Sequence, residues 1–110
     1  MSIPNVPEQF LFLINQVYDM ERKVNRLTEK NSLGRNLDRM KNKFVEMGFE
    51  IDDPMGQTYN ETRTDCEANI AGDSSENLVI TDVIKPIIRL RNGAASMIVQ
   101  KAVVIAESRS

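Results

Sequence analysis

Residues 7–48 read PEQFLFLINQVYDMERKVNRLTEKNSLGRNLDRMKNKFVEMG, and the apolar side chains of this stretch decide the fold. They recur every three or four residues over 10–27, lapse around 31–34, and resume over 33–47. This spacing is typical of amphipathic helices that pack through a narrow apolar face. The lapse indicates a turn, so the stretch predicts an antiparallel hairpin of two helices.

Residues at the expected helix ends support this division. Pro7 suits the first turn of a helix, and Ser32 is a good N-cap residue. Gly48 is the residue type preferred just after the last turn. The pattern therefore predicts one helix over residues 7–30 and a second over 33–47. The alternative is one continuous helix with a local skip.

An isolated helical hairpin has nothing to cover its far side, so half of its apolar surface stays in water. Self-association into a four-helix bundle is the simplest remedy. The sequence thus predicts a homodimer that is held together by the helices. The expected interface residues are Phe10, Leu13, Val17, Met20, Val24, Leu27, Leu33, Leu37, Met40, Phe44 and Met47.

After Gly48 the apolar period changes from helical to strand-like. Phe49 and Ile51 alternate with acids, and residues 53–56 (Asp-Pro-Met-Gly) form a turn signal. Asn92-Gly93 carries the sequence signal of a tight hairpin. Further strand candidates are residues 65–70, 78–84 and 87–90.

The last strand candidate, residues 97–106, is apolar on both faces apart from Gln100 and Lys101. Such a pattern predicts the central, doubly covered strand of a small sheet. Pro86 places the segment that follows it at an edge or a bend, because proline lacks a backbone donor. The fold class is therefore α+β, with a helical dimerisation hairpin over residues 1–48 and a small β module over 49–110.

Length and charge limit the classes of function. The chain has 110 residues, 41% hydrophobic and 27% charged, which suits one modest domain. No segment reaches the roughly 18 apolar residues of a membrane span, so we expect a cytoplasmic protein with no membrane contact. The net charge is about +2 over residues 1–48 and −4 over 49–110. Nucleic-acid binding needs a clustered basic surface, so a basic protein partner fits the acidic half better.

Catalytic and metal chemistry find little support in the side chains. The chain has no histidine and one cysteine, Cys66, which lies between two acids and has no base to activate it. Glu50, Asp52 and Asp53 do not have the spacing of a calcium loop, and Pro54 makes a turn the better interpretation. We therefore expect a protein that is not an enzyme and that uses no metal or cofactor.

Three segments carry a resemblance to a known family. They are Met47-Gly48-Phe49-Glu50-Ile51, the stretch Asp53-Pro54-Met55-Gly56-Gln57-Thr58-Tyr59-Asn60, and Ala102-Val103-Val104-Ile105-Ala106-Glu107. In their order and spacing, these segments resemble the GrpE family of nucleotide exchange factors for DnaK-type chaperones. The resemblance spans roughly residues 10–107, without the long N-terminal stalk helix that family members usually carry.

The resemblance implies a homodimeric co-chaperone whose β module docks on an Hsp70/DnaK-type ATPase and favours its open state. Partner contacts are then expected at Arg89, Met97, Gln100 and Lys101. Gln100 stands where the family favours an arginine that contacts the chaperone. The alternative is a dimeric adaptor that recruits a protein partner without nucleotide exchange.

Overall fold

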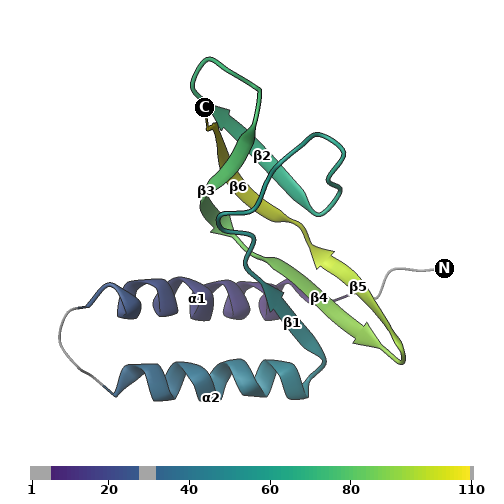
Figure 1. Ribbon diagram of the computed structural model, residues 1–110. Coiled ribbons are helices and arrows are strands. Elements are labelled where there is room, and N and C mark those ends of the chain that lie inside the picture. Colours follow the sequence, from purple (N-terminus) through teal and green to yellow (C-terminus); the bar gives the residue numbers. More distant parts are fainter. Residues whose placement is uncertain (1–5, 28–31, 110) are drawn as a thin grey trace.

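The computed structural model describes residues 6–27 and 32–109, and it has two helices followed by six strands (Figure 1). The predicted α+β class is confirmed, with the helices in the first half of the chain and the strands in the second. The helices are α1 (Glu8–Asn25) and α2 (Leu33–Glu46). The strands are β1 (Phe49–Asp52), β2 (Cys66–Ala71), β3 (Leu78–Lys85), β4 (Ile87–Asn92), β5 (Ala95–Gln100) and β6 (Ala102–Ser108).

The predicted helical hairpin is confirmed, because α1 and α2 run side by side in opposite directions rather than as one continuous helix (Figure 1). Pro7 precedes the first turn of α1, as expected. This helix ends at Asn25, earlier than predicted. Residues 28–31, which include the predicted end of the helix and the start of the expected turn, lie outside the described residues. Gly48 has a φ of 97° and follows the C-cap of α2, where glycine was predicted.

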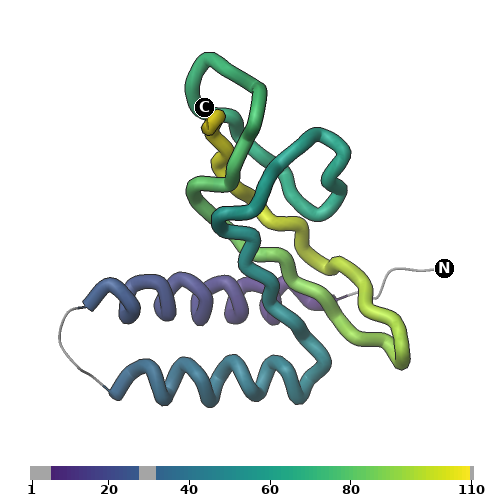
Figure 2. The backbone as a smooth tube through the Cα atoms, viewed as in Figure 1, coloured from purple at the N-terminus to yellow at the C-terminus, as the bar shows by residue number. Residues whose placement is uncertain are grey.

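Strands β3 to β6 form one long antiparallel ribbon that bends in the middle (Figure 2). One arm of the ribbon is β3 and β4, the other is β5 and β6, and a tight turn at Gly93 and Ala94 joins them. The predicted Asn-Gly hairpin is therefore confirmed. The ribbon's bend, which we call the corner, lies at Pro86 on one arm and at Lys101 on the other.

Each half of the ribbon gains a third strand, which produces two sheets. β1 pairs antiparallel with β4, so that one sheet has the order β1-β4-β5. β2 pairs parallel with β6, so that the other has the order β2-β6-β3. Between β1 and β2 the chain makes the predicted turn at 53–56, in which the backbone N–H of Met55 donates to Asp53 Oδ1 at 3.0 Å.

One sequence-based prediction about this ribbon is wrong, and a second is confirmed only in part. Residues 97–106 are not one strand, because the chain leaves one sheet at Gln100 and enters the other at Ala102. Only the β6 half is central, whereas β5 lies at an edge. The segment after Pro86, which we placed at an edge or a bend, is the central strand β4, and Pro86 itself lies in the bend.

The hydrophobic core has two parts, and α1 contributes to both. Ile14 packs with Phe49 and Ile88 of the first sheet. Tyr18, one turn further on, packs on the second sheet in a cluster that includes Ile80, Val83 and Val104. The face of α1 that points toward the β module is therefore buried against the chain's own strands.

Candidate functional site

The outer face of the helical hairpin carries two rows of exposed apolar side chains. On α1 and its C-terminal extension they are Leu13, Met20 and Leu27, and on α2 and its C-cap they are Leu33, Met40 and Met47. Members of each row are seven residues apart, so they lie on one side of their helix. Their exposed fractions range from 37% for Met40 to 55% for Leu27. We call these six residues the apolar stripe.

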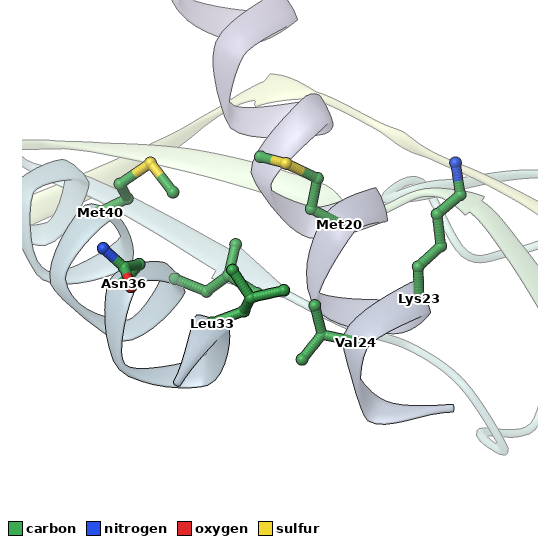
Figure 3. Close-up of a pocket in the computed structure, with 7 residues that line it drawn as sticks. Met20, Lys23, Val24, Leu33, Asn36 and Met40 are labelled. Atoms are coloured by element: carbon green, nitrogen blue, oxygen red, sulfur yellow. The ribbon is translucent and has the colours of Figure 1, made fainter. Parts of the chain in front are cut away.

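A groove of about 260 Å³ runs between the two helices within the apolar stripe (Figure 3). It is lined by Met20, Lys23, Val24, Leu33, Asn36, Leu37 and Met40. Met20 and Val24 reach it from α1, and Leu33 and Met40 reach it from α2 (Figure 3). Its deepest member is Leu37, which is almost completely buried. The groove therefore has the shape and chemistry to receive apolar ridges from another helix.

The remaining residues of the predicted dimer interface lie between the helices or against the β module. Val17 and Leu37 are buried, and Val24 is half-buried in the groove wall. Phe10 and Phe44 pack against the cluster that contains Phe49, with 6.1 Å between the ring centroids of Phe10 and Phe49. A spacing of three and four residues identifies an apolar face, but it does not say which partner covers each side chain.

Two large exposed apolar side chains on the hairpin were not among the predicted interface residues. Phe12 and Val45 are the most exposed large apolar residues within 6–27 and 32–109, at 60% and 62%. Neither continues the heptad series of the apolar stripe, and this is why the spacing did not select them. Phe12 lies beside a separate cleft that α1 forms with the β module.

The predicted partner-binding residues lie along β4, along β5 and at the corner of the ribbon, and they differ in their availability. Lys101 is exposed and lies between β5 and β6, whereas Met97 is half-buried in β5. Arg89 projects from β4 and forms an ion pair with Asp52 of β1 at 2.8 Å. Lys101 is therefore the predicted contact that is most open to a partner.

Gln100 is held by the chain itself. Its Nε2 donates to the Oδ1 of Asn15 and to the backbone oxygen of Pro86, both at 2.9 Å. In return, Asn15 Nδ2 donates to Gln100 Oε1 at 2.8 Å. Asn15 was not among the predicted site residues, although a polar residue directly after the apolar run 10–14 was the available signal. This amide pair fastens α1 to the corner of the ribbon.

A second polar contact fastens α1 to β3. Arg22 Nη2 forms an ion pair with Asp82 at 2.8 Å, and Arg22 Nη1 donates to the backbone oxygen of Val83. The same guanidinium lies 5.7 Å from the centre of the Tyr18 ring. Burial and the nearby carboxylate of Asp53 raise the pKa of Tyr18, so its phenol stays protonated at neutral pH.

Cys66 and its neighbours have a structural role. The thiol is buried in the cluster below the second sheet, and this burial raises its pKa above the ordinary value. Arg63 binds Asp65 through two nitrogens, at 2.9 and 3.0 Å, and this hydrogen bonding lowers the pKa of Asp65. Cys66 is thus a protonated core side chain rather than a reactive thiolate.

Comparison of the chain with known proteins supplies no relative. No protein-family model, curated protein or solved structure matches it. Within residues 6–27 and 32–109, no three acidic, cysteine or histidine side chains gather into a metal-binding group. No helix in the same ranges is long and apolar enough to cross a membrane.

Proposed function

We propose that the chain is a homodimeric co-chaperone similar to GrpE, which acts as a nucleotide exchange factor by binding the open state of an Hsp70/DnaK-type ATPase. The proposal of a dimer is supported by the apolar stripe and its groove, because six large apolar side chains stay partly exposed in the single chain. A second copy of the hairpin would bury both rows in a four-helix bundle.

The bundle fits the charge of the hairpin as well as its shape. Lys23 and Asn36 stand in the groove lining, but Lys23 is paired with Asp19 on its own helix at 3.0 Å. Lys41 of α2 is likewise paired with Glu21 of α1 at 2.7 Å. Two hairpins can therefore approach with these charges already neutralised.

The β module supplies the proposed docking surface. Arg63, Arg89 and Arg91 are each paired with an acid of the same module. Lys85 and Lys101 have no such pair among the described residues, and they stand on the two arms of the ribbon near its corner. An acidic patch on an ATPase lobe would complement these two charges.

No covalent chemistry is required for the proposed activity. A protein that binds the open, nucleotide-free form of an ATPase more tightly than its closed form shifts the equilibrium by the difference between the two affinities. Nucleotide release is then accelerated because the open form becomes more populated.

One observation favours the alternative, a dimeric adaptor without exchange activity. The resemblance implies an arginine contact at position 100, but Gln100 uses its amide within the chain, on Asn15 and Pro86. An adaptor would keep the dimer and the β-module surface while leaving the ATPase conformation unchanged.

Stopped-flow release of a fluorescent nucleotide from a purified DnaK-type ATPase separates the two functions. The proposed factor accelerates release, and the double substitution Lys85→Glu with Lys101→Glu removes this effect while the dimer persists. An adaptor binds the ATPase without changing the release rate. If the ATPase neither binds the chain nor releases nucleotide faster, both proposals fail for this partner class.

A further inference from the structure

Two open sheets have four edges, and each edge strand presents N–H and C=O groups that can pair with another chain. Here the edge strands are β1 and β5 in one sheet, and β2 and β3 in the other. Native proteins protect such edges with charged side chains, with proline or with a covering segment. The way in which each edge is protected therefore shows where a further strand can add.

The edge of β3 is covered by the chain. Three backbone hydrogen bonds of 2.9 Å link residues 56–59 to residues 78–80 of this strand. Further along β3, Arg22 reaches from α1 to the backbone oxygen of Val83. A strand from another protein has no room on this side.

The edges of β1 and β2 carry acids. Glu50 and Asp52 project from β1, where Arg91 and Arg89 hold them. Glu67 projects from β2 and is exposed. Charges on an edge strand oppose the addition of another strand because pairing would desolvate them.

The edge of β5 has neither form of protection. Residues 93–100 read Gly-Ala-Ala-Ser-Met-Ile-Val-Gln and contain no charged side chain and no proline. β5 pairs with β4 on one side only, and within the described ranges nothing pairs with its other side. It is thus the single uncovered and uncharged edge among the described strands.

A cleft of about 400 Å³ lies at the end of this edge, between Gln100 and the first half of α1. Leu11 and Phe12 give the cleft an apolar wall, and Glu8 and Lys85 add one charge of each sign to its lining. Phe12 is 60% exposed and does not belong to the apolar stripe. The cleft therefore offers an apolar contact to a segment that runs along β5.

We propose that the outer edge of β5 binds an extended, uncharged segment of another protein as an added strand, with one apolar side chain of this segment against Phe12. Backbone hydrogen bonds would supply the affinity, and the cleft would supply the selectivity. A second copy of the chain is the less suitable occupant, because the proposed dimer already uses the apolar stripe. A second self-pairing face on a chain that already dimerises would produce tetramers or open polymers instead of the dimer; this one step rests on the proposed function.

The test uses a capped octapeptide of alternating valine and threonine, and a second in which leucine replaces valine, added to the isotope-labelled chain in an NMR titration. We expect the amides of Ser96 and Ile98 to shift and their hydrogen exchange to slow about tenfold at saturation. Peptides methylated on every backbone nitrogen should not bind, because methylation removes the donors that a β-ladder requires from both edges of the peptide. Ser96→Lys should abolish binding. The matched control Ala94→Lys, in the adjacent turn, should retain it.

Phe12→Ala should weaken the binding of both peptides without removing it, because the ladder remains while the apolar contact is lost. Failure of both peptides to shift β5 at millimolar concentration would overturn the proposal, and so would equal binding of the methylated peptides. A Ser96→Lys variant that lowers the oligomeric mass of the free chain would identify a second copy as the occupant. The titration is repeated with the double variant Met20→Glu, Met40→Glu, which should disrupt the proposed dimer. Peptide binding should survive in this variant, so a failure of the dimer can be distinguished from a failure of the β5 proposal.

Discussion

At the scale of single residues, Gln100 shows how one side chain serves the corner of the ribbon. Pro86 has no N–H, and its carbonyl lies where the two sheets part, so the regular ladder is interrupted there. Gln100 donates to this carbonyl and to Asn15 with the same amide nitrogen. The apolar pattern identified Gln100 as one of two polar exceptions, and the resemblance placed a partner contact there; its hydrogen bonds to Asn15 and Pro86 lie within the chain.

Gln100→Ala should lower the free energy of unfolding by about 1–3 kcal/mol, because the Pro86 oxygen and the half-buried Asn15 amide would lose their partners. Urea denaturation measures this change. Lys101→Ala is the control at the adjacent exposed position, and it should change stability by less than about 0.5 kcal/mol. Equal, small effects of the two substitutions would show that the amide pair contributes nothing to stability.

Asp65 links stability to pH through its contact with Arg63. Its pKa is lowered in the folded chain, so the contact stabilises the fold above the ordinary carboxyl pKa and this contribution is lost as the pH falls through the folded value. Asp65→Asn should therefore be less stable than the wild type near pH 7, with the difference shrinking toward about pH 2. Urea midpoints across this range measure it. A difference that stays constant with pH would contradict the assignment.

At the scale of elements, the sequence predicted a helix or turn correctly where each face of the element has a single environment, either core or solvent. The heptad spacing located both helices, and Gly48 and Gly93 located the turns that follow α2 and β4. The stretch 97–106 misled because its apolar residues serve two different clusters. Val99 packs on the core of the first sheet and Val104 on that of the second. The change of sheet is marked only by Gln100 and Lys101, which interrupt the apolar run at that point and which the pattern did not identify as a bend.

Two glycines make a matched pair of substitutions at the ends of α2. Gly48→Ala should destabilise the fold by about 1–2 kcal/mol, because φ is 97° there and the new Cβ would lie 3.4 Å from the Leu90 side chain. Gly34→Ala should stabilise it by about 0.5 kcal/mol, because Gly34 lies within the helix and an added Cβ meets nothing within 4 Å. Thermal unfolding measures both. Effects of the same sign would contradict this account of the helix ends.

At the scale of the whole molecule, α1 has two apolar sides, and the sequence could not assign them. Ile14 and Tyr18 face the sheets, whereas Leu13 and Met20 face away from them. Both sides contribute to the same three- and four-residue spacing. Only the position of the sheets distinguishes the side of α1 that packs on the β module from the side that stays exposed in the single chain.

Met20→Glu together with Met40→Glu should convert the proposed dimer to a folded monomer. Both side chains are partly exposed in the single chain, so the charges cost little there but would be buried without partners in a four-helix bundle. Sedimentation velocity reports the mass, and circular dichroism reports the fold.

Ile70→Glu, at an exposed position of the β module, is the control that should leave the dimer intact. Leu37→Asp is expected to unfold the chain instead, since Leu37 is buried within the protomer. A wild-type chain that sediments as a monomer, or a double variant that still dimerises, would refute the bundle.

The bent ribbon also sets the order in which the chain is expected to fold. Its two arms meet at a two-residue turn, so the contacts nearest Gly93 close short loops and lose little chain entropy. β1 and β2 pair with strands that are distant in the sequence, and β2 pairs in parallel with β6. Such non-local pairings form slowly. We therefore expect the ribbon to nucleate at its tip and zip toward the corner, with β2 as the last strand to dock.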